Sequence, residues 1–294
     1  MSKRFTLVVA MLTLFLALTS GPRAPVTLAQ GTATPVAVDP PQALLPPQPP
    51  NQPGQKAKIN GVDIYYEVYG QGDPVILLHG GLGNGDYWVN QIPPLASTYQ
   101  VIVMDSRGHG RSSFDDKPIS YELMASDVLG LMDLLKIQKA DIVGWSDGGI
   151  IGLELAIHHP ERLNKVVAYG ANYDPSGVRL DIGQNERFNA FIDQAAKDYQ
   201  TMSPAPERWD AFLTNIEHMW ATEPNYTEQQ LQAITTPFLI LDGAEEEAID
   251  LNQTKLMALL IPGAQLVLIP DTGHFAMFEQ PAEFTKIVTD FLAS

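Results

Sequence analysis

Short runs of apolar residues recur along the chain from residue 75 onward, and each run ends at a polar residue, a glycine or a proline. Continuous apolar runs of this kind are typical of buried strands in parallel sheets. The runs are residues 75–78, 101–104, 142–143, 166–169, 238–241 and 266–269. Because segments with helical spacing lie between several of them, the pattern predicts an α/β fold, with a mostly parallel, twisted sheet flanked by helices.

Three segments have the spacing of helices, and one has that of a hairpin. Residues 150–158 and 281–292 predict amphipathic helices, and the His-His-Pro that follows residue 157 ends the first of them. Residues 120–137 predict another helix, with Ser120 as N-cap. Its apolar face is predicted to contain Leu123, Val128, Leu131, Leu134 and Leu135. Residues 57–69 predict a β-hairpin, because Asn60-Gly61 favours a type I′ turn.

The alternation of strands and helices stops between residues 173 and 235. This stretch has a helical pattern and is rich in aromatic residues, so it predicts a helical lid inserted into the domain. The aromatic residues are Phe188, Phe191, Tyr199, Trp209, Phe212, Trp220 and Tyr226. Most are expected to form the core of the lid, and a few to line an apolar substrate pocket.

The first 55 residues differ in composition from the rest. Residues 1–29 resemble a signal peptide, with Lys3 and Arg4 before an apolar run at 5–18 and a small residue, Ala29, at the cleavage site. The apolar run is shorter than the about 20 residues that span a membrane, although an uncleaved anchor is the alternative. Residues 30–55 are rich in proline and predict an extended, disordered linker before a domain at 56–294.

Charge and cysteine content exclude several classes of function. The formal net charge is -16 with no basic cluster, which argues against binding of nucleic acid or anionic membranes. The chain contains no cysteine, which excludes disulfides, thiolate metal sites and a cysteine nucleophile.

A serine motif follows the run at 142–143. Residues 144–148 read Gly-Trp-Ser-Asp-Gly, which fits G-x-S-x-G, and a predicted helix follows directly. Strand, sharp turn and helix form the arrangement called a nucleophile elbow, in which Ser146 would lie exposed above the sheet. The alternative is a glycine-rich turn with an incidental serine, but the flanking strand and helix favour the elbow.

Two other loops follow buried strands. Residues 79–85 contain four glycines at a strand end, so backbone N–H groups there can face a ligand, and we predict an oxyanion hole. In residues 105–112, Asp105 and Arg107 are expected to brace the loop as a pair, and His109 is expected to be structural. His158 and His159 are expected to lie at a solvated helix end.

A serine nucleophile needs a base, and the base needs an acid that orients it. His274 follows the last strand with a glycine beside it, so it is the predicted base. The acid should follow the preceding strand, where Glu245, Glu246 and Glu247 all come after Gly243. The residues alone leave these three glutamates open.

From about residue 57 to its end, the chain resembles the α/β-hydrolases, in the lid-bearing group of esterases, lactonases and perhydrolases. The motifs that carry the resemblance are His-Gly-Gly at 79–81, the loop at 105–112, Gly-Trp-Ser-Asp-Gly-Gly at 144–149 and Gly-His-Phe at 273–275. The resemblance implies that the acid is three residues after Gly243, at Glu246, where the family usually has aspartate. It also implies an oxyanion hole from the N–H groups of Asp147 and Gly81, with Leu82 as the second choice for the latter.

The serine motif further resembles the valacyclovir-hydrolase (biphenyl-hydrolase-like) branch. In that branch the acidic residue after the serine is linked to substrates that carry an amine, so Asp147 is a candidate for binding amino-esters. The alternative is that Asp147 simply complements the positive end of its helix.

These observations predict an exported serine hydrolase that cleaves small-molecule carboxylic esters through an acyl-enzyme on Ser146. No cofactor, metal, nucleic acid or stable membrane insertion of the mature chain is expected. Lactonase, perhydrolase and carbon–carbon hydrolase are alternatives with the same triad. A non-enzymatic ligand-binding protein and an adhesion module built around the proline-rich linker are alternatives from other classes.

Overall fold

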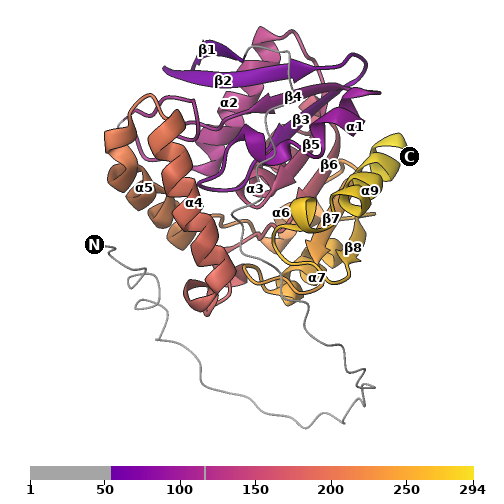
Figure 1. Cartoon of the computed structure of the whole chain (residues 1–294). Helices are drawn as coiled ribbons and strands as arrows, with labels where there is room; N and C mark the ends of the chain where they lie inside the picture. Colours follow the sequence, from indigo (N-terminus) through magenta and orange to yellow (C-terminus); the bar gives the residue numbers. More distant parts are fainter. Residues whose placement is uncertain (1–53, 116) are drawn as a thin grey trace.

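The computed structural model describes residues 54–115 and 117–294, which fold around a twisted eight-stranded sheet (Figure 1). The strand order is β1-β2-β4-β3-β5-β6-β7-β8. Strand β2 runs antiparallel to β1 and β4, and the other pairs are parallel, which confirms the predicted sheet. The strands are β1 (Gln55–Ile59), β2 (Val62–Tyr69), β3 (Pro74–Leu78), β4 (Gln100–Met104), β5 (Ala140–Trp145), β6 (Leu163–Tyr169), β7 (Phe238–Gly243) and β8 (Gln265–Ile269).

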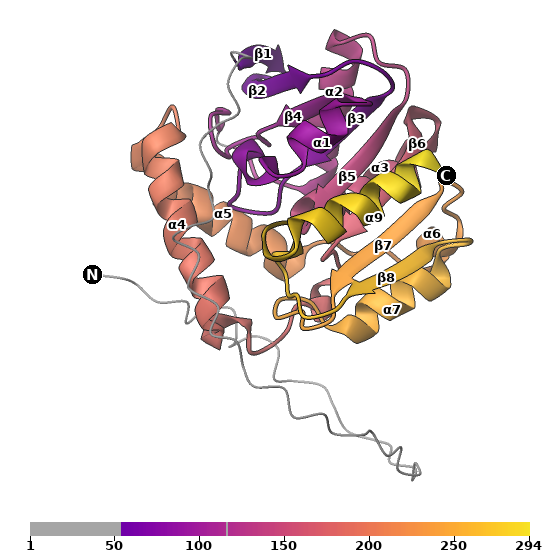
Figure 2. The ribbon, with the colours of Figure 1, turned by 45° about the vertical axis from the view of Figure 1, so that its right-hand side comes forward.

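Helices cover both faces of this sheet. Figure 2 shows α1 and α9 on one face and α2, α3 and α7 on the other. The helices are α1 (Ile92–Ala96), α2 (Tyr121–Leu134), α3 (Asp147–His158), α4 (Glu186–Met202), α5 (Trp209–Thr222), α6 (Glu228–Gln232), α7 (Leu251–Leu260), α8 (Ala276–Glu279) and α9 (Pro281–Ala293). Because β3 to β8 are parallel, their carboxyl ends meet at one edge of the sheet, and the loops there can converge on a site.

The predicted hairpin is confirmed. Residues Ile59 and Val62 pair across the turn, and Asn60 and Gly61 have φ of 47° and 90°, as a type I′ turn requires. Asparagine and glycine are the residues that tolerate positive φ most readily, so the sequence at this turn sets the register of β1 on β2.

Two helices differ from their predicted faces. In α2 the Ser120 hydroxyl caps the N–H of Leu123, as predicted, but Leu134 is 52% exposed. Val128 and Leu131 are buried as predicted, and the buried face also contains Met124 and Met132, which the leucine spacing did not indicate. Helix α2 packs against α3. Helix α3 is not amphipathic. Its residues 147–156 are all buried, because it lies between the sheet and α2.

The segment between β6 and β7 contains three α-helices, α4, α5 and α6, where the sequence predicted a helical insertion at 173–235. Helices α4 and α5 lie side by side next to the α/β core (Figure 1). Of the seven aromatic residues named for this stretch, Phe191, Tyr199 and Phe212 are buried in the main core, and the others pack against it. The expectation that most of them form a core of the lid is therefore met only in part, because three of the seven are buried and these belong to the main core.

The predicted signal peptide at 1–29 and residues 30–53 of the predicted linker lie outside the described residues. The described chain begins at Gly54, and β1 begins at Gln55, the last residue of the predicted linker. Within the described part of the chain, no helix has both the length and the apolar character needed to cross a membrane.

Candidate active site

Ser146 occupies a sharp turn between β5 and α3. Its φ of 54° and ψ of -118° are unfavourable for a residue with a side chain, and the surrounding backbone holds it there. The Ser146 N–H donates to the carbonyl of Tyr169 at 2.7 Å, and the Ser146 carbonyl accepts from the N–H groups of Gly149 and Ile150. Strand, strained serine and helix have the geometry of a nucleophile elbow.

The glycines on either side of Ser146 are required by space. A Cβ on Gly144 would come within 2.1 Å of the carbonyl oxygen of Gly148. A Cβ on Gly148 would come within 2.1 Å of the carbonyl oxygen of Leu78 in β3. Both obstacles are backbone atoms, which cannot rotate away, so any side chain here would push α3 off the sheet.

We therefore expect Gly148→Ala to destabilise the protein by about 3 kcal/mol, the upper range for overpacking a core. Gly149→Ala on the same helix is the matched comparison, because its Cβ would meet the Cβ of Ala171 at 3.0 Å, a milder contact. Urea unfolding of the two variants measures the difference. Equal stability of the two would contradict the steric argument.

His274 and Glu246 are in direct contact, although 28 residues separate them. The Nδ1 atom of His274 lies 3.0 Å from Oε2 and 2.9 Å from Oε1 of Glu246. The carboxylate is fixed in turn, because its Oε1 accepts from the N–H groups of Ala248 and Ile249 at 2.6 and 3.1 Å. Nδ1 therefore donates to Glu246, which leaves Nε2 of the imidazole as the basic nitrogen.

The other two glutamates have different positions. Glu245 is exposed. Glu247 accepts the backbone N–H of His274 at 2.8 Å and lies 3.7 Å from the guanidinium of Arg187 on α4. Of the three alternatives left open by the sequence, Glu246 is the one whose carboxylate contacts the imidazole.

The His274 ring lies next to the elbow. Gly170 follows Tyr169, whose carbonyl holds Ser146, and a Cβ on Gly170 would come within 2.8 Å of Cε1 of His274. The ring also lies 5.9 Å from the indole of Trp145, centroid to centroid. The structure thus brings the predicted nucleophile, base and acid to the carboxyl ends of β5, β8 and β7, at one edge of the sheet.

Burial dominates the electrostatics of this site. It raises the pKa of Glu246 to about 7, against hydrogen bonds from Asp242, Ala248 and Ile249 that lower it. Burial also lowers the pKa of His274, although the charge of Glu247 opposes this. Both shifts disfavour the charged form of the side chain concerned, and because the two groups are in contact they titrate as a pair.

Asp242 is a neighbour of Glu246 that the sequence did not indicate. It is completely buried, accepts from the hydroxyl of Thr254 at 2.7 Å, and is hydrogen-bonded to Glu246. Burial raises the pKa of Asp242 well above its usual range, and the Glu246 charge adds to this. Burial thus favours the protonated form of Asp242, which can donate its proton in the hydrogen bond to the Glu246 carboxylate.

The N–H groups of Gly81 and Asp147, which are expected to bind an oxyanion, belong to residues that lie close together in space. A Cβ on Gly81 would come within 2.5 Å of Oδ2 of Asp147. Within the described residues, no carbonyl accepts from the N–H of Gly81 or of Leu82. Asp147 is the first residue of α3, so its N–H has no partner within the helix.

The loop at 105–112 is braced as predicted, but the predicted pair is wrong. Asp105 accepts from Nε of Arg111 at 2.7 Å, and Arg107 donates to Asp127 of α2 at 2.6 Å. The two side chains separate because Asp105 folds back into its own turn, whereas Arg107 is buried under α2. His109 is structural, as expected: its buried ring packs edge-on against Phe212 at 4.7 Å.

His158 is half exposed at the end of α3, as expected of a solvated helix end. Within residues 54–115 and 117–294, no three histidine or acidic side chains come together in a way that could hold a metal ion.

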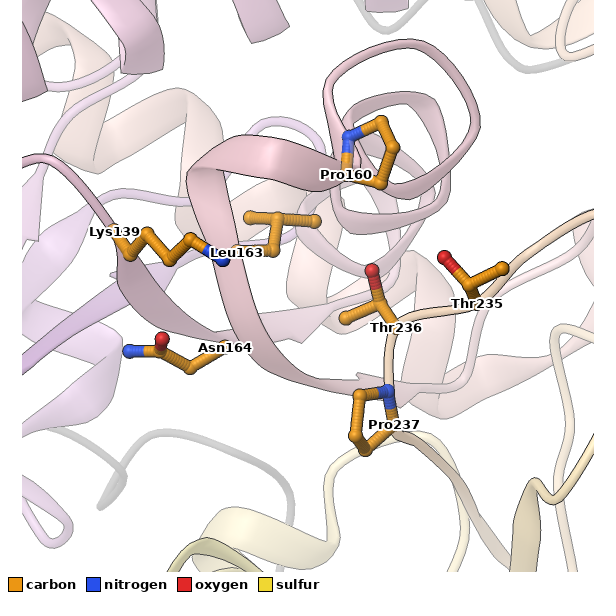
Figure 3. A pocket seen from close by; sticks show the side chains of 7 residues that line it. All are labelled: Lys139, Pro160, Leu163, Asn164, Thr235, Thr236 and Pro237. Carbon is orange, nitrogen blue, oxygen red and sulfur yellow. The ribbon is translucent and has the colours of Figure 1, made fainter.

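A separate pocket of about 330 Å³ lies away from this site, and Figure 3 shows the side chains that line it. It is lined by Lys139, Pro160, Leu163, Asn164, Thr235, Thr236 and Pro237. Leu163 begins β6, and Pro237 directly precedes β7, so this pocket lies where these parallel strands start. It belongs to a different surface from the Ser146 site.

Comparisons with known proteins agree with this geometry. Residues 73–201 match the family model described as alpha/beta hydrolase fold. The human (Homo sapiens) serine hydrolase BPHL is 29% identical over 253 residues, which cover 81% of this chain and 85% of that protein. The 2-hydroxymuconate semialdehyde hydrolase of Pseudomonas sp. (strain CF600) is 30% identical over 273 residues, 83% of this chain and 96% of that protein.

A solved structure of Est816, described as an N-acyl homoserine lactone degrading enzyme, has a TM-score of 0.65 and 30% identity. The match covers 81% of this chain and 100% of the Est816 chain. Identity at this level over almost the whole of the relatives, together with the sheet order and the elbow, means that the chain belongs to the α/β-hydrolase superfamily and is a hydrolase.

Proposed function

We propose that this hydrolase cleaves carboxylic esters through an acyl-enzyme on Ser146. The observation that carries the proposal is the strained Ser146 turn beside a buried imidazole, whose Nδ1 is held by the Glu246 carboxylate. A hydroxyl becomes nucleophilic when a positioned base takes its proton, and an ionised acid keeps the base in the correct tautomer. Ser146, His274 and Glu246 take these three roles.

In the proposed mechanism, Ser146 Oγ attacks the ester carbonyl while His274 Nε2 takes its proton. The negative oxygen of the tetrahedral intermediate accepts from the N–H groups of Asp147 and Gly81. Collapse of the intermediate expels the alcohol, which receives the proton from His274. Water then attacks the acyl-enzyme with His274 again as base, which releases the acid and restores Ser146.

The surroundings of the imidazole favour an apolar substrate. The rings of Phe188 on α4 and of Phe275 lie 6.3 and 5.6 Å from the His274 ring. Pockets for small substrates are mostly apolar with a few polar groups that orient the reacting bond. An acyl or alcohol group with aliphatic carbons fits these surroundings better than a charged one.

A substrate panel tests the proposal. The full chain and Ser146→Ala are assayed with p-nitrophenyl esters from acetate to long acyl chains, with an N-acyl homoserine lactone, and with a 2-hydroxymuconate semialdehyde. We expect the linear esters to have the highest kcat/KM, and the best chain length then measures the pocket. Preference for the lactone or the semialdehyde would replace the ester proposal with the activity named for Est816 or for the Pseudomonas relative. A folded protein that turns over none of them would favour a ligand-binding role.

We further propose that the protein is exported and that residues 1–29 are removed. The support is the sequence pattern of a basic start, an apolar run and a small residue at position 29. The proline-rich stretch that follows would then begin the mature chain, ahead of the domain. Mass spectrometry of the protein recovered outside the cytoplasm tests this: a mature chain that begins at Gln30 supports export, and an intact Met1 in the cytoplasm contradicts it.

The rate should rise with pH through neutrality. The mechanism needs a neutral His274 and an ionised Glu246, and burial raises the pKa of Glu246 to about 7. Below this pH the pair holds an additional proton, so we expect kcat/KM for a p-nitrophenyl ester to increase between about pH 6 and pH 8. In Glu246→Gln the residual rate should have its acid limb at lower pH, since burial lowers the pKa of His274. A wild-type rate already at its maximum at pH 5 would contradict this assignment.

A further inference from the structure

The indole of Trp220 joins the inserted helices to the first residue of α3. Its Nε1 lies 2.9 Å from Oδ1 and 3.1 Å from Oδ2 of Asp147. The hydroxyl of Tyr121, the first residue of α2, donates to Oδ1 of the same carboxylate at 2.9 Å. Asp147 is only 4% exposed, so two uncharged donors from different helices hold its carboxylate in the interior.

The same indole also lies against Gly81. A Cβ on Gly81 would come within 2.4 Å of Cζ2 of Trp220 and within 2.5 Å of the Asp147 carboxylate. Trp220 therefore contacts both residues whose N–H groups are proposed to bind the oxyanion. It contacts one through a hydrogen bond to the side chain and the other through direct packing on the backbone.

The chain after Trp220 makes two more contacts with the α/β core. The carboxylate of Glu223 accepts the N–H of Tyr121 at 3.1 Å. The hydroxyl of Tyr226 donates to Glu154 of α3 at 2.7 Å. The end of α5 and the turn after it are thus attached to α2 and α3, and Asp147 is one of the residues that hold them there.

We propose that Trp220 is a positioning residue that completes the oxyanion hole when α5 is seated on the core. A carboxylate beside a developing oxyanion raises the energy of the transition state by repulsion unless it is directed away. The indole N–H and the Tyr121 hydroxyl fix the direction of the Asp147 carboxylate, and the indole ring fixes Gly81. This inference rests on the ester-hydrolase function proposed above.

The arrangement also bears on substrates that carry an amine. The Asp147 carboxylate already accepts three hydrogen bonds, from Trp220 and Tyr121, and burial raises its pKa to about 6. A substrate ammonium would have to displace the indole to reach it. A role in positioning the oxyanion hole therefore predicts that plain esters and amino-esters depend on Trp220 equally.

The test compares Trp220→Phe with Trp209→Phe in the full-length protein. Both residues are on α5, but Trp209 packs on Tyr199 and Phe212, and among the described residues it has no contact with Asp147. We expect Trp220→Phe to lower kcat for a p-nitrophenyl ester by about 10-fold or more with little change in KM, because loss of an oxyanion donor itself lowers kcat 10²- to 10³-fold. Affinity for an alkylboronic acid, which forms a tetrahedral adduct with serine, should fall by a similar factor. Trp209→Phe should leave both near wild type.

Asp147→Asn provides a second variant that keeps the shape of the side chain. It retains one acceptor oxygen, so we expect a smaller loss of kcat than in Trp220→Phe, and equal losses for a plain ester and a matched amino-acid ester. If Trp220→Phe does not fold, the inference is tested by comparing the kcat of Asp147→Asn with the kcat of Trp209→Phe.

Four results would overturn the inference. They are a kcat for Trp220→Phe equal to that of Trp209→Phe, an effect on KM alone, unchanged boronic acid affinity, and a loss confined to the amino-ester. The two proposals can be separated. If the wild-type protein hydrolyses the ester and Ser146→Ala does not, the ester-hydrolase function stands even when the Trp220 inference fails. A folded wild-type protein with neither turnover nor boronic acid binding would remove both.

Discussion

Ser146→Ala is expected to lower kcat for p-nitrophenyl esters by about 10⁴-fold or more, because a triad acts as a unit and loses nearly all its effect without its nucleophile. The fold should survive, since the hydrogen bonds at this residue come from its backbone and a methyl group fits the same turn. A fluorophosphonate should add one label to the wild-type protein and none to Ser146→Ala, as measured by intact mass. Ser176→Ala provides a control, because this serine lies in the inserted segment and is exposed.

An activity in Ser146→Ala close to that of Ser176→Ala would show that hydrolysis takes place elsewhere. If activity is lost and the melting temperature is also lower, the loss could come from the missing serine or from misfolding, and the labelling separates these two explanations. A folded variant that has lost its reactive serine accepts no label, whereas misfolding lowers labelling in proportion to the folded fraction.

Glu246→Gln is expected to lower kcat by about 10³- to 10⁴-fold, since an uncharged amide neither stabilises the imidazolium nor enforces the tautomer that leaves Nε2 free. Glu245→Gln is the matched control. It has the same chemistry one residue away, but its side chain is exposed, so we expect wild-type kinetics. The measurement is kcat and KM for one ester at pH 8, where the ionised form of the pair predominates.

Equal losses in Glu245→Gln and Glu246→Gln would contradict the assignment of the acid. Glu247→Gln is a useful third variant, because Glu247 binds the backbone N–H of His274 rather than the ring. We expect it to have a smaller effect than Glu246→Gln, through the position of the loop alone.

The strands, the hairpin and the order of the candidate triad could be predicted because each depends on local pattern. An apolar run followed by Gly-Trp-Ser-Asp-Gly indicates a strand and an elbow without any knowledge of the rest of the chain. The face of α2 was less predictable, since leucine spacing alone did not show that Met124 and Met132 are buried while Leu134 is exposed. Helix α7 was not predicted at all, because its apolar positions follow no clear periodicity.

Contacts between distant residues account for the rest. The choice among three adjacent glutamates depends on which side of the loop faces the sheet, and that is set by the N–H groups of Ala248 and Ile249. Trp220 and Asp147 are 73 residues apart, and in the sequence Trp220 was one of seven aromatic residues with nothing to distinguish it. The pairing of Arg107 with Asp127 rather than with Asp105 also depends on a contact between residues that are distant in the sequence.

The burial of Glu246 has a consequence for the stability of the fold. Its pKa is raised from 4.5 to about 7, so between these values the native protein binds a proton that the unfolded chain has released. The contribution of Glu246 to stability then decreases as pH rises through this range, whereas the lowered pKa of His274 contributes the opposite slope. At Glu246, burial thus favours the protonated form, which is catalytically silent, and this contribution has been lost where activity is full.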